Sequence, residues 1–106
     1  MSEGELWSEL LQARAEGLPA ALATIIHTRG HCPREAGARM LVLRDGRCLG
    51  TIGGGCGEAE VRRLALLVME EREPLLHVVD LLDDPAQPDG AVCGGKMEVF
   101  IEPVSP

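Results

Sequence analysis

Residues 39–71, RMLVLRDGRCLGTIGGGCGEAEVRRLALLVMEE, decide the fold of this chain. Two apolar runs, 39–44 and 47–52, flank an Asp-Gly pair, which is a strong signal for a tight turn between antiparallel strands. Three glycines, Cys56 and Gly57 follow, and apolar residues then recur at helical spacing over 58–71. The stretch therefore predicts a β-hairpin, a glycine loop and a helix in succession.

The flanking segments complete an α+β pattern. One-faced apolar spacing predicts a helix over 3–15, which Gly17 and Pro19 end. The apolar run 20–28 predicts a strand buried on both faces, and a polar loop follows at 29–38. Two more strands are predicted over 77–82 and 96–104, with a loop rich in Pro and Asp at 83–90. We expect one domain over 1–106 with its core in 20–104, built from two helices and a mixed, mostly antiparallel sheet of about five strands.

Length and composition exclude several classes of protein. The chain has 106 residues, enough for one small core, and Trp7 and Phe100 are its only aromatic residues, so that core is aliphatic. The net charge of -7 disfavours non-specific binding to nucleic acid or anionic membranes, and an anionic ligand would need a local basic pocket. No apolar run has the length of a membrane span and no secretory signal pattern is present. We expect a cytoplasmic protein whose four cysteines are thiols, and the lack of a C-x-x-C pair disfavours structural zinc.

The glycine loop is the strongest candidate binding site. Gly53, Gly54 and Gly55 let backbone N–H groups approach a ligand, and the helix N-terminus adds positive potential, which suits phosphate or another oxyanion. The alternative is a tight turn in which glycine only supplies a positive φ. The dinucleotide fingerprint is absent because Glu58 and Glu60 stand where its last glycine would fall, and residues 90–97 lack the Ser or Thr of a P-loop.

Two glycine-flanked cysteines are the candidate reactive thiols. Cys56 is expected near the first turn of the helix, where the helix dipole favours thiolate, although Glu58 acts partly in the opposite direction. Cys93 precedes Gly94 and Gly95, which keep its surroundings open to a ligand. For both cysteines the alternative is a buried thiol that behaves as an apolar residue.

Three arginines lie in or beside the loop at 29–38. If that loop faces the glycine turn, Arg29, Arg34 and Arg39 form a local positive pocket, although each is equally compatible with a solvated position. The positions of Cys32 in this loop and of Cys48 in the hairpin indicate structural roles for these two thiols. The three histidines have no ligand or triad spacing and the aspartates of 80–89 indicate a solvated stretch, so catalysis is only weakly indicated.

Several ordered blocks resemble the N-terminal domain of the XdhC/CoxI family, which comprises accessory factors that mature molybdenum hydroxylases. These blocks are ALATIIHTRGHCPREAGARMLV at 21–42, the hairpin, GTIGGGCGEAEV at 50–61 and DGAVCGGKMEVFIEPV at 89–104. The resemblance extends from about Ala20 to Val104. It implies that the protein is an accessory factor rather than an enzyme. Such a factor binds molybdenum cofactor as cargo and presents it for sulfuration and for insertion into the apo-enzyme.

The resemblance also suggests roles for the candidate residues and names partners. The glycine amides of 53–55 and 94–95, Glu58 and the three arginines would surround the phosphate and pterin oxygens, while the thiolate of Cys56 or Cys93 would approach the molybdenum. The implied partner is an apo molybdenum hydroxylase of the xanthine or carbon monoxide dehydrogenase type. A cysteine desulfurase and a second copy of the chain are further candidates, whereas nucleic acid and membrane are not expected.

The sequence departs from the family pattern at three places. Gly57 stands where an apolar residue commonly follows the cysteine, and His31-Cys32 replace small residues, so we expect a reshaped ligand loop. The Rossmann-like C-terminal domain of longer members is absent from these 106 residues. Two alternatives stay open: a thiol carrier in which Cys56 or Cys93 accepts persulfide sulfur, and an interaction module that holds a hydroxylase or a separate Rossmann partner without a ligand of its own.

Overall fold

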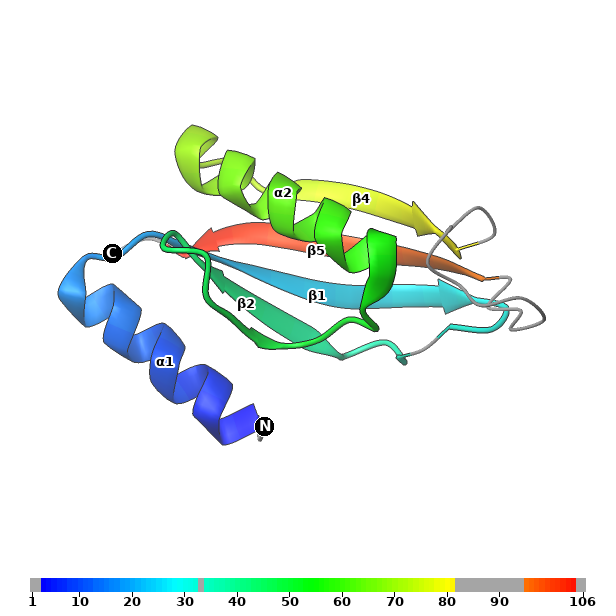
Figure 1. The fold of residues 1–106 in the computed structure, drawn as a ribbon, viewed down its shortest axis with the longest axis horizontal. Helices are drawn as coiled ribbons and strands as arrows, with labels where there is room; N and C mark the ends of the chain where they lie inside the picture. The colour runs from blue at the N-terminus through cyan, green and yellow to red at the C-terminus, as the bar shows by residue number, and fades with distance from the viewer. Residues whose placement is uncertain (1–2, 33, 82–94, 105–106) are drawn as a thin grey trace.

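The structure is a computed structural model that describes residues 3–32, 34–81 and 95–104. Its elements, in chain order, are α1 (Glu3–Glu16), β1 (Ala20–Arg29), β2 (Arg39–Leu43), β3 (Cys48–Gly50), α2 (Gly55–Glu71), β4 (Leu75–Asp80) and β5 (Lys96–Val104) (Figure 1). The expected α+β class with two helices and a five-stranded sheet is confirmed. The loop predicted at 83–90 lies outside the described residues, as do Cys93 and Gly94.

The five strands form one sheet in the order β3-β2-β1-β5-β4, and each pairing of described strands is antiparallel. The predicted hairpin joins β2 to β3, with Val42 opposite Cys48. Its turn is closed by Asp45, whose carboxylate accepts hydrogen bonds from the backbone N–H of Arg47 at 3.0 Å and from its Nε at 2.8 Å. β3 ends at Gly50, before the predicted residue 52, because Gly50 has a φ of +80° and the chain there leaves the sheet for the glycine loop.

Two separate apolar cores lie on the two faces of the sheet. Alternate residues of β1 divide between them: Ala21, Ala23 and Ile25 belong to the cluster that α2 covers, whereas Ala20 and Leu22 belong to the cluster that α1 covers. Each helix therefore buries one face of the central strand.

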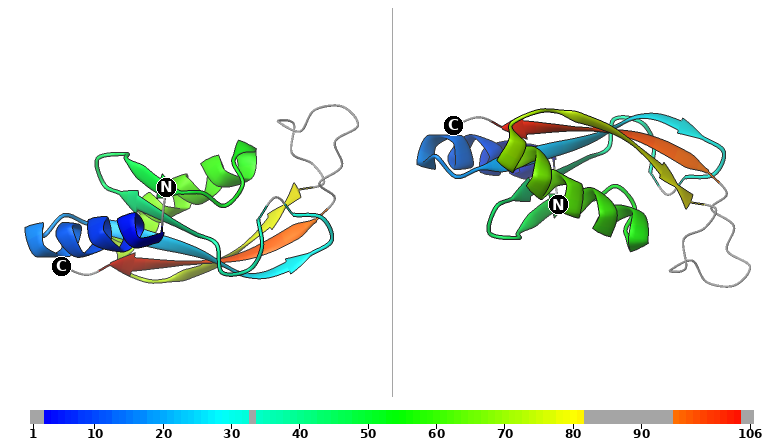
Figure 2. Two further views of the ribbon diagram at one scale, coloured as in Figure 1. Left: turned by 90° about the horizontal axis from the view of Figure 1, so that it is seen from below. Right: turned by 90° about the horizontal axis from the view of Figure 1, so that it is seen from above.

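The prediction that β1 is buried on both faces holds only for its first half. A β-bulge between Ile25 and His27 shifts the register against β5, and Ile26, the extra residue of that bulge, is 51% exposed. Figure 2 shows the reason: α1 lies at one end of the molecule and β1 and β5 extend beyond it. The far half of the strand has no helix over its second face.

Element boundaries differ from the predicted ones by up to three residues. α2 begins at Gly55 instead of residue 58, so that Cys56 is its second residue. At its other end Arg72 adopts a left-handed conformation (φ 59°) and donates its backbone N–H to the carbonyl oxygen of Val68 at 2.8 Å. This tight end lets β4 begin at Leu75, two residues before the predicted start. In the described ranges, no helix combines the length and the apolar character needed to cross a membrane.

Candidate functional site

The glycine loop needs glycine at all three of its positions. Gly53, Gly54 and Gly55 have φ values of 127°, 79° and 72°, a region that residues with a Cβ rarely adopt. A Cβ placed on Gly54 would meet no atom within 4 Å, so the loop borders open space there. Backbone conformation alone thus accounts for the glycine run, and the loop is also accessible to a ligand.

Glu58 folds back from the first turn of α2 and holds this loop. Its Oε1 accepts hydrogen bonds from the hydroxyl of Thr51 at 2.5 Å, from the N–H of Ile52 at 3.0 Å and from the N–H of Gly54 at 3.3 Å. The hydroxyl oxygen of Thr51 in turn accepts the N–H of Gly53 at 3.0 Å. The amides of Ile52, Gly53 and Gly54 therefore have partners within the chain, and the anion beside this part of the loop is a carboxylate.

The N-terminus of α2 remains a favourable place for an external anion. Its N-cap residue, Gly54, has no side chain that could cap the helix, and the first N–H groups of a helix have no partner within the helix. These groups carry the positive end of the helix dipole. Cys56 lies in this first turn.

Gly57 has a packing role, which its position after the cysteine did not indicate. It is buried in α2, and a Cβ there would lie 2.7 Å from Cγ1 of Val79 in β4. Ordinary contacts of a Cβ begin at about 3.4 Å, so only glycine lets the helix approach the strand this closely. A residue with a larger side chain would not fit at this position.

Arg34 and Arg39 lie together, whereas Arg29 lies elsewhere. A hollow of about 280 Å³ is lined by Glu3, Leu6, Arg34, Gly37, Ala38, Arg39, Gly50 and Thr51. Because Thr51 also bonds to Glu58, this hollow adjoins the glycine loop. Arg29 ends β1 and lines a different depression, with His27, Val78, Lys96 and Glu98. The predicted basic pocket thus contains two of the three arginines.

Helix α1 already engages one of these two guanidinium groups. Nη1 of Arg39 lies 2.6 Å from Oε1 of Glu3 and donates to the carbonyl oxygen of Gly37 at 3.4 Å. The same guanidinium lies over the ring of Trp7, 5.4 Å from its centroid. Arg34 is exposed. An anion entering the hollow would meet Arg34 directly and would compete with Glu3 for Arg39.

Gly95 and Cys32 fix the loop after β1 against the start of β5. A Cβ on Gly95 would collide with the carbonyl oxygens of His31 and Arg29 and would lie 2.7 Å from Sγ of Cys32. That thiol lies 3.5 Å from the carbonyl oxygens of Arg29 and Lys96. Cys32 and Cys48 are free, half-buried thiols that pack against the α2-side core, as their expected structural roles require.

The sequence prediction of the site did not include three residues that contact it in the structure: Thr51, Glu3 and Trp7. A Thr before the glycines and a Glu in the first helical turn are the residue types of a capping box, but their separation of seven positions is not the spacing of that motif. Glu3 and Trp7 lie in a helix whose only visible signal was its apolar face. No local pattern indicates that this helix reaches Arg39, which is 36 positions away from Glu3.

Comparison with known proteins gives consistent matches. The model of the XdhC and CoxI family matches residues 13–80. The protein YqeB of Escherichia coli K12 is 38% identical over 96 residues, which cover 91% of this chain and 18% of YqeB. A probable xanthine dehydrogenase subunit of Bacillus subtilis 168 is 34% identical over 88 residues, which cover 81% of this chain and 27% of that protein. The molybdenum cofactor insertion chaperone PaoD of Escherichia coli K12 is 41% identical over 59 residues, which cover 56% of this chain and 19% of PaoD.

The fold also matches a solved structure. A crystal structure of a xanthine dehydrogenase from Bacillus halodurans is similar with a TM-score of 0.83 and 37% sequence identity, over 99% of this chain and 31% of that chain. The chain thus spans between about a fifth and a third of the length of the relatives that it matches.

Proposed function

The chain belongs to the XdhC and CoxI family, and on that premise we propose that it is a maturation factor for a molybdenum hydroxylase, which holds molybdenum cofactor for sulfuration and insertion into the apo-enzyme. The similarity to PaoD, named as a molybdenum cofactor insertion chaperone, supports the cofactor as cargo. The similarity to chains named as xanthine dehydrogenases supports a hydroxylase of that type as the partner.

The observation that carries this proposal is the hollow with Arg34 and Arg39 beside the open N-terminus of α2. The chain has a net charge of -7, so an anionic cargo needs a local concentration of positive charge. Guanidinium groups bind phosphate through paired N–H donors, and a helix N-terminus adds N–H groups and positive potential. Thr51 connects the two features, because it lines the hollow and its hydroxyl bonds to Glu58 in the first turn of α2.

The cofactor's phosphate belongs at Arg34 and the first turn of α2 in this proposal. The amides of Ile52 and Gly54 already donate to Glu58, so Glu58 is a positioning residue that shapes the loop. Arg34 has the larger share of the binding because Arg39 is paired with Glu3. Arg29, in another depression, is no longer assigned to the phosphate.

Cys56 is the thiol that we assign to the molybdenum side of the cofactor. Its place in the first turn of a helix favours the thiolate, which is a soft ligand for molybdenum. Cys93 is the second candidate, on the strength of its flanking glycines in the sequence.

The test is an anaerobic titration of the purified chain with molybdenum cofactor, followed by size exclusion and molybdenum analysis. The wild type and the Cys48→Ser control, which changes a thiol in the hairpin, should retain the cofactor stoichiometrically. Arg34→Ala should weaken retention by about tenfold, the equivalent of one charge-assisted hydrogen bond, and Cys56→Ser should weaken it as well. Circular dichroism verifies that each variant is folded. No retention by the wild type would refute the proposal.

A sulfur carrier is the second candidate function, favoured by the same position of Cys56 at the helix N-terminus. In that reaction the Cys56 thiolate attacks the outer sulfur of a donor persulfide, a new S–S bond forms on Cys56, and the donor leaves as a thiolate. Incubation with a cysteine desulfurase and labelled cysteine distinguishes the two functions. A Cys56→Ser variant that still binds cofactor but takes up no label would favour the carrier.

A further inference from the structure

The exposed apolar side chains of this protein gather on one side. Seven large hydrophobic residues are exposed among the described ones. Trp7, Ile26 and Val78 line hollows on the sheet face that α1 covers only in part, the strand register puts Leu76 on the same face, and Leu11 lies on α1. The five, with their exposed fractions, are Trp7 (38%), Leu11 (61%), Ile26 (51%), Leu76 (52%) and Val78 (51%). We call this side the open face. The remaining two, Leu66 and Leu67, lie on α2.

The topology explains why this face is bare. Leu6 and Leu10 of α1 pack against Leu41 and Leu43 of β2, so the helix covers one end of the sheet. On the neighbouring strands the register places Phe100 of β5 between Thr24 and Leu76. The row that crosses these strands is therefore apolar on β5 and β4 and begins with a threonine on β1, and no helix of the described chain lies over it. Soluble monomers rarely leave a contiguous patch of this kind in water.

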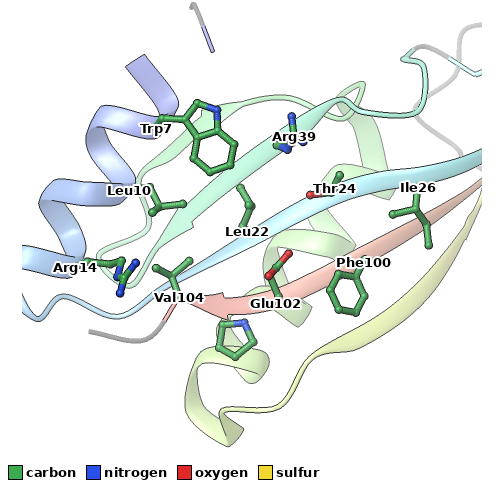
Figure 3. A pocket seen from close by; sticks show the side chains of 11 residues that line it. Trp7, Leu10, Arg14, Leu22, Thr24, Ile26, Arg39, Phe100, Glu102 and Val104 are labelled. Carbon is green, nitrogen blue, oxygen red and sulfur yellow. The ribbon is translucent and has the colours of Figure 1, made fainter. Parts of the chain in front are cut away.

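A hollow of about 650 Å³ separates α1 from the bare strands. Figure 3 shows Trp7, Leu10 and Arg14 of the helix on one side of it and Phe100 and Glu102 of β5 on the other. Trp7, Leu11 and Arg14 follow one another at helical spacing, so they form one flank of α1. The open face thus has an apolar floor, a raised apolar flank and charges at its rims.

The charges of the open face balance, although those of the whole chain do not. Its hollows are lined by four cations, Arg14, Arg29, Arg39 and Lys96, and by two anions, Glu98 and Glu102. Two further anions, Glu3 and Asp80, pair with Arg39 and Lys96. The net charge of -7 therefore comes from the rest of the molecule. Two copies would repel each other at most other surfaces, whereas this one carries both signs in equal number. A self-complementary patch is what a two-fold interface requires.

We propose that the open face is an interface between two copies of this chain, in which the α1 flank of each copy covers the bare strands of the other. Arg14 of one copy then faces Glu102 of the other, twice per dimer. The three bare strands present about 400 Å², from their spacing and rise. A standard interface buries about 800 Å² per partner, so the flank must supply the remainder, and we expect a dissociation constant in the micromolar range.

The first measurement is the molar mass of the whole chain by sedimentation equilibrium from about 1 to about 200 µM, a range that brackets such an affinity. The wild type should pass from monomer to dimer. Val78→Lys, on the open face, should stay monomeric with an unchanged circular dichroism spectrum. Leu66→Lys, an equal change on the exposed side of α2, should dimerise like the wild type. A wild type that is monomeric throughout, or a Leu66→Lys variant that loses the dimer as Val78→Lys does, would overturn the proposal.

A mixing experiment tests the contact between copies. Arg14→Glu and Glu102→Arg each place like charges against each other in their own dimers, so each variant alone should be monomeric. In an equal mixture both contacts have opposite signs again, and the dimer should return. A mixture that stays monomeric, or single variants that dimerise normally, would refute this arrangement. Restoration also excludes misfolding as the cause of the monomers.

Discussion

The sharpest quantitative prediction concerns the carboxylate of Glu58. Three donors converge on its Oε1: the hydroxyl of Thr51 and the N–H groups of Ile52 and Gly54. Glu58→Ala removes this acceptor, and the amide of Ile52, a residue that is only 1% exposed, loses its partner. Glu58→Gln keeps one carbonyl oxygen for all three donors and removes only the charge.

The expected magnitudes follow from those contacts. An unsatisfied buried donor costs about 1–3 kcal/mol, and hydrogen bonds to a charged group contribute about 1.5–3 kcal/mol each. Gly54 lies beside open space, so water can replace its bond. We therefore expect Glu58→Ala to lower the free energy of unfolding by about 3 kcal/mol and Glu58→Gln by about 1 kcal/mol.

Urea denaturation followed by circular dichroism measures both values, since a single domain of this size unfolds in one cooperative step. Glu70→Ala is the matched control, a carboxylate on the exposed side of the same helix, and should change stability by less than about 0.5 kcal/mol. If Glu58→Ala resembles the control, or if Glu58→Gln is as damaging as Glu58→Ala, the convergence of donors on one oxygen does not hold the loop.

Three further predictions rest on close contacts and on one carboxyl group. Gly57→Ala should destabilise the chain by about 1–2 kcal/mol in the same assay, because contact with Val79 outweighs the better helix propensity of alanine; a neutral result would contradict the packing role. Gly95→Ala should cost more, because backbone carbonyls obstruct its Cβ, and it should expose Cys32 to a thiol reagent; labelling at the wild-type rate would count against this. Two hydrogen bonds lower the pKa of Asp45 below its ordinary 3.8: the larger effect comes from the backbone N–H of Arg47 and the smaller from its side chain. The ionised carboxylate therefore stabilises the turn above that pH, and the stabilisation is lost as the pH falls through the lowered pKa. Arg47→Ala removes the side-chain donor and keeps the backbone N–H, which is the larger cause, so NMR titration should show the pKa of Asp45 rising only part of the way towards 3.8; an unchanged pKa would refute the side-chain contribution.

Local signals predicted the elements well. Asp45-Gly46 located the hairpin because an Asp-Gly turn needs no distant partner, and the 3.6-residue spacing located α2 because its buried face repeats within the segment. The start of α2 was predicted three residues too late, since glycine has a low helix propensity. Here the bonds of Glu58 fix the chain just before Gly55, which overrides that propensity.

Distant partners limited the rest of the prediction. The apolar sequence of β1 predicts a strand that is buried on both faces. Whether a helix covers the second half of this strand depends on where α1 ends. The glycine loop was correctly placed between strand and helix, whereas the acceptor of its amides depends on the rotamer of Glu58. Arg29, Arg34 and Arg39 were grouped by sequence, but Arg29 lines another depression. The pairing of Arg39 with Glu3 depends on how α1 packs.

Arg39 links the two proposed surfaces of the molecule. Its side chain lines both the hollow beside the glycine loop and the hollow of the open face, and α1 binds it through Glu3 and Trp7. An anion that draws Arg39 away from Glu3 must loosen the first turns of α1, and those turns carry the flank that the proposed dimer needs. Linkage is reciprocal, so a dimer that holds α1 in place must oppose the release of Arg39 by the same free energy. If both proposals hold, cofactor binding through Arg39 and dimerisation are therefore antagonistic, whereas binding through Arg34 alone leaves the dimer unchanged.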